Sequence, residues 1–239
     1  MRVCICGGGN AVHVMASDMG TRDDLWVGIY APYQDEAERF QAGLDAAGGF
    51  VSRRLRGDVT HGEPDAVSAE AADVVPGADV VLIPLPSYSH EGTLQAITPH
   101  LKEGCIIVAL PGQGGFNWVA RNILGDQRAS RMIIAGTNQL PYQCRILKYG
   151  AEVELIGYKR QIQVATEPRD AAEVVGDAGM VIGIDDYPAM AKACEQIVRD
   201  ATYRQQLIEA GTSRVGQFSV ELLAMRMRDV YQSAVSTEA

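Results

Sequence analysis

Three consecutive glycines near the start of the chain, Gly7, Gly8 and Gly9, have the residue type and spacing that most directly indicate chemistry. They follow an apolar run at residues 3–6 and precede a helix-like stretch at residues 11–19. Glycine lets a backbone turn tightly beside a phosphate, and the free N–H groups that begin a helix attract negative charge. The pattern predicts a dinucleotide site whose diphosphate contacts are Gly7, Gly8, Gly9, Asn10 and Ala11. Val12 stands where this pattern usually has Gly or Ala, and a purely structural turn is the alternative.

The residues after the second apolar run bear on the choice between NAD and NADP. This strand normally ends in an acid that binds the ribose of NAD, or is followed by Arg for the 2′-phosphate of NADP. Here it ends at Tyr30, a predicted cofactor contact, and Asp35 and Glu36 are expected only to charge the first turn of the next helix. Candidate cations for a 2′-phosphate, with solvated surface as the alternative, are Arg53, Arg54 and Arg56. The sequence leaves NAD and NADP both open.

Two further loops follow apolar runs and are expected to flank the cofactor. The predicted contacts in these loops are Pro84, Leu85, Pro86 and Gly112. His90 begins a helix beside the first loop, and it is the candidate catalytic residue, with simple helix capping as the alternative. His13 lies in the first predicted helix, and its side chain is expected to pack there rather than to react. No His, Cys, Asp or Glu spacing fits a metal site, and no nucleophile motif is present.

Net charge, apolar runs and cysteine spacing limit which partners and compartments we expect for the protein. The net charge of −9 argues against a nucleic-acid or acidic-membrane partner, because both require clustered Lys and Arg. The longest apolar runs, residues 78–85 and 105–110, are too short to span a bilayer, and we expect no signal peptide before the first strand. The five cysteines form no C-x-x-C pair, so we expect buried, reduced thiols in a cytoplasmic protein.

Alternating strands and helices are predicted to position these residues. Strands are expected at residues 3–6, 25–30, 50–55, 79–84, 105–110 and 131–136. Helices are expected at residues 11–19, 35–47, 65–75, 90–101 and 116–124. This order predicts the α/β class, with a Rossmann-type doubly wound parallel sheet that binds its ligand at the carboxyl ends of the strands.

The pattern changes near residue 138. Two short strands at residues 151–157 and 161–165 are expected to pair with each other, followed by helices at residues 188–199, 202–210 and 218–235. We therefore predict a dinucleotide-binding domain over residues 1–168 and a mostly helical segment over residues 169–239, packed on that domain.

Several stretches resemble the opine (octopine/nopaline) dehydrogenases. They are VCICGGGNAVH at residues 3–13, DEAERF at 35–40, GADVVLIPLPSYSHEGTLQ at 77–95, VALPGQGGFNWVARNILGD at 108–126, LPYQCR at 140–145 and ELIGYK at 154–159. The resemblance covers roughly residues 1–168 in family order. It implies a domain that binds NAD or NADP and serves the reductive condensation of a 2-keto acid with an amino acid, by hydride transfer to an imine.

The chain departs from that family at two points. Members that bind an arginine-type amine have an acid before the Leu-Pro motif, and here that position is Asn138, which Gln139 follows. We take both as substrate candidates and expect no guanidinium substrate. The family also has a helical second domain that supplies its acid–base group, and nothing in residues 169–239 matches that domain.

The tail resembles the C-terminal end of retaining glycosyltransferases of the GT-B fold, family four, at residues 172–182, 187–211 and 217–231. That family's donor-binding carboxylate motif is not in the chain, and ordinary amphipathic helices are the alternative. The leading hypothesis is an oxidoreductase domain. The alternatives are a non-catalytic nucleotide-binding module, which could be a homodimer through its C-terminal helices, and a glycosyltransferase remnant that binds a nucleotide diphosphate.

Overall fold

The computed structural model describes residues 1–55, 57–113, 115–159 and 162–167, and single positions between 196 and 210. The chain divides into two compact units, Met1–Ala171 and Ala172–Ala239. In the second unit, described positions such as Gln196 and Tyr203 are helical, whereas the predicted helix at 218–235 lies outside the described residues. Among the described residues, no helix has the length and apolar character required to cross a membrane.

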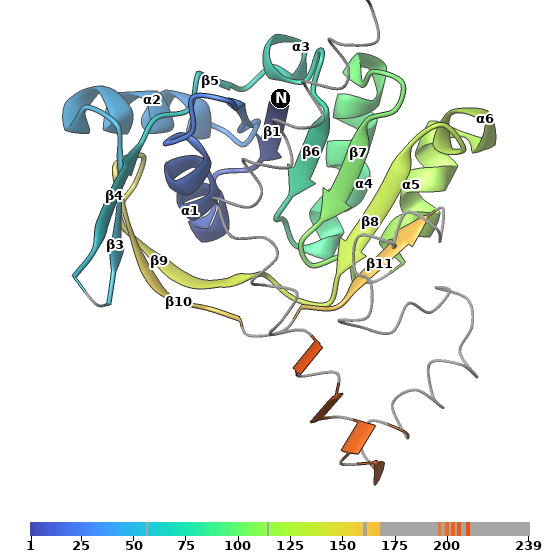
Figure 1. Cartoon of the computed structure of the whole chain (residues 1–239). Coiled ribbons are helices and arrows are strands. Elements are labelled where there is room, and N and C mark those ends of the chain that lie inside the picture. Colours follow the sequence, from blue (N-terminus) through green and yellow to red (C-terminus); the bar gives the residue numbers. More distant parts are fainter. Residues whose placement is uncertain are drawn as a thin grey trace, which may run out of the picture. The chain divides into compact units, whose positions relative to one another are not determined.

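A seven-stranded sheet with the order β11-β8-β7-β6-β1-β2-β5 runs through the first unit (Figure 1). Its strands are β1 (Arg2–Cys6), β2 (Trp26–Tyr30), β5 (Ala66–Ser68), β6 (Val80–Ile83), β7 (Ile106–Ala109), β8 (Ile133–Thr137) and β11 (Val164–Glu167). All neighbouring pairs are parallel except β11 with β8. Apart from the added β11, this is the dinucleotide-binding strand order, in which the direction of winding reverses between β1 and β6.

Helices cover both faces of this sheet, as the doubly wound prediction requires. One face packs against α1 (Asn10–Met19) and α2 (Glu36–Ala47), and its core includes Ile5, Val12 and Phe40. The other face packs against α3 (Ala71–Val74), α4 (Ser87–Ile97) and α5 (Phe116–Leu124). Successive side chains of a strand point to opposite faces, so Ile5 and its neighbour Cys6 belong to different core clusters.

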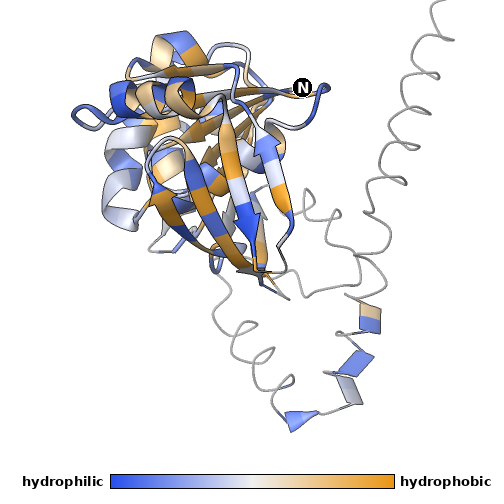
Figure 2. Cartoon of the chain, turned by 90° about the vertical axis from the view of Figure 1, so that its left-hand side faces the viewer, coloured by the Kyte–Doolittle hydropathy of each residue, from blue (hydrophilic) through white to orange (hydrophobic). Residues whose placement is uncertain are grey.

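A second sheet of four strands has the order β4-β3-β10-β9. Its strands are β3 (Phe50–Arg54), β4 (Val59–Gly62), β9 (Tyr142–Lys148) and β10 (Glu152–Tyr158). On its inner side, Val153 and Leu155 pack against Val14 of α1. Helix α1 therefore lies between the two sheets, which explains why every residue from Ala11 to Ser17 is buried. In Figure 2, which faces this side of the unit, hydrophobic and hydrophilic residues alternate along the strands.

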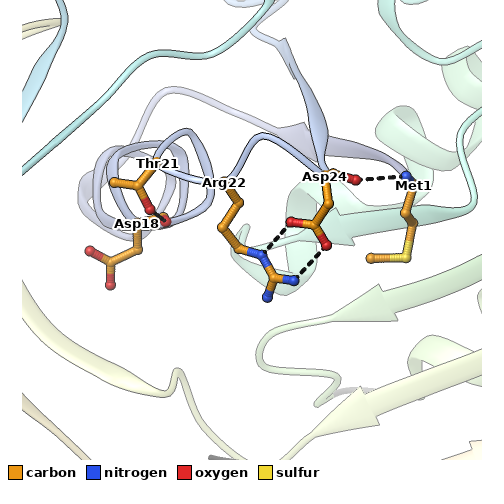
Figure 3. Close-up of polar contacts among 5 residues, drawn as sticks. All are labelled: Met1, Asp18, Thr21, Arg22 and Asp24. Carbon is orange, nitrogen blue, oxygen red and sulfur yellow. Dashed lines mark hydrogen bonds and ion pairs between the residues drawn. The ribbon is translucent and has the colours of Figure 1, made fainter. Parts of the chain in front are cut away.

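Contacts at the far end of α1 fix the crossing from this helix to β2 (Figure 3). The Thr21 hydroxyl donates to the Asp18 carbonyl at 2.8 Å and so closes the last turn. Arg22 donates to both carboxylate oxygens of Asp24, at 2.9 and 2.7 Å. The amino group of Met1 donates to the Asp24 carbonyl at 2.9 Å, which ties the start of β1 to this crossing. The glycine turn lies at the opposite end of α1.

The helix predicted at residues 65–75 is wrong over most of its length. Residues 66–68 form β5, which pairs in parallel with the edge of β2, and only residues 71–74 are helical. The Asp65 carboxylate also accepts the Val27 N–H at 2.6 Å. Pairing with an open sheet edge thus outweighs the helix propensity of this alanine-rich segment.

The predicted pairing of residues 151–157 with 161–165 is also wrong. β10 pairs instead with β9 and β3, and β11 pairs with β8. Neither β9 nor β4 was predicted, since both are partly exposed strands without a continuous apolar run, and β4 is only four residues long. Helix α4 begins at Ser87 rather than residue 90 and ends at Ile97, before a 3₁₀ turn at Thr98–His100 that contains Pro99.

Candidate dinucleotide-binding site

The first glycine joins three elements at the carboxyl end of β1. The Gly7 N–H donates to the Tyr30 carbonyl of β2 at 2.7 Å. Gly7 has a φ of +107°, and a β-carbon there would lie 2.5 Å from Cδ2 of Leu85, in the loop after β6. Only glycine meets both constraints. The structure thus brings together three predicted contacts, Gly7, Tyr30 and Leu85, although Tyr30 offers its carbonyl while its side chain is buried in the core.

The third glycine leaves open space at the start of α1. Gly9 is the N-cap residue of α1, and no heavy atom lies within 4 Å of the position that a β-carbon would occupy. No side chain of the described residues caps this helix, so its first N–H groups are available to an anion. Ala11, in the first turn, is buried. This end of α1 has the geometry that a diphosphate requires.

His13 holds the glycine turn from inside the protein. Its Nδ1–H donates to the Gly9 carbonyl at 2.9 Å, and its Nε2 accepts the Gly150 N–H at 3.0 Å. The ring packs against Phe40, with centroids 4.4 Å apart. Burial lowers the pKa of His13 to about 4, so the ring is neutral at pH 7. The expected packing role of His13 is confirmed, and it includes a link to the turn between β9 and β10.

The side chain of Asn10 also contacts the second sheet. Its Oδ1 accepts the backbone N–H of Ile146 in β9 at 2.7 Å. That bond uses the Oδ1 acceptor, so Asn10 could meet a diphosphate through its backbone N–H or through its Nδ2 donors. The predicted cofactor contact of Asn10 stays a prediction.

Two residues beside Gly8 were not predicted as site residues. A β-carbon at Gly8 would lie 2.8 Å from Oε1 of Glu36 and in contact with the Tyr149 hydroxyl. Burial raises the pKa of Glu36, and it raises the pKa of Tyr149 to about 12. Glu36 was assigned only a role at the helix terminus, and nothing local in the sequence signals that Tyr149 reaches the turn.

The loop after β6 is held by His90. Its Nε2–H donates to the Leu85 carbonyl at 2.9 Å, and its ring meets Phe116 edge-on, with centroids 5.1 Å apart. Burial lowers the pKa of His90, and only 2% of the residue is exposed. Pro86, the N-cap residue of α4, begins the helix in this loop, directly after Pro84 and Leu85. His90 thus has a packing role, and its catalytic role stays a prediction.

The remaining predicted residues lie at the ends of β7 and β8. The Gly112 N–H donates to the Thr137 carbonyl at 2.7 Å, and a β-carbon there would meet the Gly136 backbone. Asn138 accepts the Gln163 N–H at 3.0 Å through Oδ1. The Gln139 carbonyl accepts the Thr137 hydroxyl at 2.9 Å. Strand spacing places the ends of β7 and β8 about 10 Å and about 14 Å from the glycine turn along the sheet edge.

Two of the three arginines that were candidates for a 2′-phosphate, Arg53 and Arg54, belong to the second sheet. Arg53 forms an ion pair with Glu152, and Arg54 pairs with Asp18 at 3.5 Å. Asp18 lies near the other end of α1, about 12 Å along the helix from the glycine turn. These positions fit the surface alternative for Arg53 and Arg54, and Arg56 lies outside the described residues.

No protein-family model matches the chain. Octopine dehydrogenase from Mizuhopecten yessoensis is 35% identical over 179 residues, which are 73% of this chain and 44% of that relative. The structure of octopine dehydrogenase in complex with NADH and agmatine matches 72% of this chain and 45% of its own, with a TM-score of 0.66 at 30% identity. The similarity supports the opine dehydrogenase family.

The chain spans less than half the length of these opine dehydrogenases. A more distant structure, yersinopine dehydrogenase with NADP⁺ bound, is 16% identical with a TM-score of 0.58 and shares the fold alone. The predicted α/β class with a Rossmann-type sheet is confirmed. The resemblance of the tail to glycosyltransferases falls largely outside the described residues and stays a prediction.

Proposed function

We propose that the first unit is the NAD- or NADP-binding domain of an oxidoreductase of the opine dehydrogenase type. The observation that carries this proposal is the open, uncapped start of α1 behind Gly9, at the strand pair where the winding reverses. Such an end of a parallel sheet is where dinucleotides bind. The NADH in the octopine dehydrogenase structure and the NADP⁺ in the yersinopine dehydrogenase structure support the same ligand class.

Each part of the site has a separate task in this proposal. The N–H groups at the start of α1 bind the diphosphate, and the loop from Pro84 to Pro86 borders the cofactor. Gly112 and the end of β8 lie farther along the strand ends, where we place the nicotinamide and the substrate. When bound, the nicotinamide supplies or accepts the hydride.

We propose a 2-keto acid and an amino acid as the substrates. Asn138 and Gln139 are the candidate contacts, and the Asn138 amide is oriented by bonds to Gln163. An amide offers no counter-charge to a guanidinium, so the Asn138 position favours an amino acid without that group. The arginine-type ligands of octopine dehydrogenase are therefore not expected here.

A second candidate function is a nucleotide-binding module without turnover, with dimerisation through the C-terminal helices as a further proposal. The favouring observation is the burial of His90, whose imidazole donates to the Leu85 carbonyl. A general acid has to reach the reacting atoms, and His90 does so only if the loop from Leu85 moves. A glycosyltransferase remnant would instead bind a nucleotide diphosphate alone.

One set of titrations separates these functions. NADH, NADPH and UDP are titrated into the full chain, with reduced-nicotinamide fluorescence and heat as readouts. Oxidation of NADH or NADPH that requires both a 2-keto acid and an added amino acid supports the enzyme. Binding without such oxidation supports the module. Binding of UDP with no binding of either nicotinamide nucleotide would overturn the dinucleotide proposal.

A further inference from the structure

Two buried polar atoms beside Gly8 have no hydrogen-bond partner among the described residues. They are Oε2 of Glu36 and the hydroxyl oxygen of Tyr149. Glu36 is the first residue of α2, and Tyr149 lies in the turn between β9 and β10. Both side chains meet at Gly8, where any β-carbon would contact them. The glycine turn is therefore bordered by an acid and a phenol from distant parts of the chain.

The fold gives no reason to turn the Glu36 carboxylate inward. An acid in the first turn of a helix is stabilised by the helix dipole while it remains solvated, as at the exposed Glu38. Glu36 is instead partly buried, and the nearby Arg39 pairs with Asp35 at 3.5 Å. Removing a carboxylate from water without a partner is unfavourable, so a ligand that donates to it would complete the site.

Glu36 stands where a dinucleotide-binding sheet needs a ribose contact. In such sheets, an acid after the second strand binds the 2′-hydroxyl of the adenosine ribose, beside the glycine turn. β2 ends at Tyr30 without an acid, as the sequence shows. Glu36 comes from the next helix and brings its carboxylate back to Gly8.

We propose that Glu36 and Tyr149 together bind the hydroxyls of the adenosine ribose and thereby select NAD(H) over NADP(H). This inference rests on the proposed dinucleotide function. The carboxylate accepts from a ribose hydroxyl, and the Tyr149 hydroxyl offers a second bond. A 2′-phosphate would bring its own negative charge next to Glu36 and would leave the carboxylate without a donor.

One described cation near the turn, Arg39, is already engaged. Arg39 lies over the Tyr149 ring, with its guanidinium carbon 4.3 Å from the ring centroid, and it also pairs with Asp35. Arg54 lies at the other end of α1, in an ion pair with Asp18. Arg39 is one cation that could turn to a 2′-phosphate, so it belongs in the test.

The test measures dissociation constants for NADH and NADPH with the full chain and four variants. We expect the wild type to bind NADH about tenfold more tightly or better, and Glu36→Gln to reduce that ratio about tenfold. Tyr149→Phe should weaken NADH binding by a smaller factor. Glu38→Gln makes the same chemical change on an exposed residue of the same helix and should leave the ratio unchanged. Thermal unfolding checks that every variant is folded.

The outcomes that contradict the ribose inference differ from those that contradict the proposed dinucleotide function. A wild type that prefers NADPH, above all if Arg39→Ala removes that preference, overturns the inference and leaves the dinucleotide proposal standing. A ratio that Glu36→Gln does not change also overturns it. Failure of the folded wild type to bind either nucleotide overturns the proposed function and this inference together.

Discussion

The two sheets of the first unit contribute differently to the candidate site. The seven-stranded sheet is covered on both faces, and the loops at its strand ends carry Gly7, Leu85 and Gly112. The second sheet carries few residues that were suspected of function. It nevertheless supplies partners for the turn, because Ile146 bonds to Asn10 and Gly150 bonds to His13. The seven-stranded sheet therefore carries the backbone groups that would bind the ligand, and the second sheet holds those groups in place.

The largest expected effect is on NADH affinity. It is tested by the same substitution at one glycine in or beside each sheet. Gly9→Val should abolish measurable binding of NADH, since the side chain would fill the space meant for the diphosphate. Gly157→Val is the matched control, because Gly157 of β10 also has nothing within 4 Å of its β-carbon position. Fluorescence titration and thermal unfolding check both. Unchanged affinity in folded Gly9→Val would place the diphosphate elsewhere.

A cavity in the second sheet tests whether that sheet is part of the same cooperative unit. Leu155→Ala should lower the free energy of unfolding by about 3 kcal/mol, because Leu155 is 2% exposed and packs with Val14 of α1. The loss should occur in one transition, since α1 belongs to both layers. Urea unfolding followed by tryptophan fluorescence measures it. Two separate transitions would show that the second sheet unfolds independently.

His13, which links the two sheets, should make the free energy of unfolding depend on pH. His13 has a pKa of about 4 when folded, against an ordinary value of 6.5, so folding favours the neutral ring. Its contribution is fully present above pH 6.5 and is lost as the pH falls towards 4, by about 3 kcal/mol in total. Urea unfolding at pH 7 and pH 4.5 should show a smaller loss in His13→Phe than in the wild type. Equal losses in both would contradict the assignment.

The smallest expected effect is at Asn10. Replacement by Ala removes the acceptor of the Ile146 N–H, and because Asn10 is exposed, water replaces part of that bond. The unfolding free energy should fall by about 1 kcal/mol, with a modest loss of NADH affinity. A loss of affinity as large as that of Gly9→Val would instead assign the Asn10 side chain to the ligand.

The sequence predicts the seven-stranded sheet far better than the second sheet. Strands buried on both faces are continuous apolar runs, so residues 79–84 and 105–110 stand out, and helix Phe116–Leu124 agrees at both ends. β9 is half exposed, and its pairing with β10 has no comparable local pattern. The prediction for residues 65–75 fails for a related reason, since an open edge of β2 decides their structure.

The candidate site divides in the same way. Gly7 and Leu85 could be predicted to converge, because both follow parallel strands whose carboxyl ends share one sheet edge. Glu36 and Tyr149 could not, because their approach to Gly8 depends on how α2 and the β9–β10 turn are positioned. Residues that directly follow strands of the main sheet can be predicted from the sequence, whereas Glu36 from α2 and Tyr149 from the second sheet cannot.

The enclosure of α1 between two sheets has a consequence for the energetics of ligand capture. A turn already fixed by His13, Tyr30 and the side chain of Leu85 has little conformational entropy left to lose when an anion arrives. Preorganisation of this kind lets most of the contact energy appear as affinity. The hydrogen-bonded backbone amides of α1, from His13 onward, should accordingly be among the slowest to exchange with deuterium, even before any nucleotide is added.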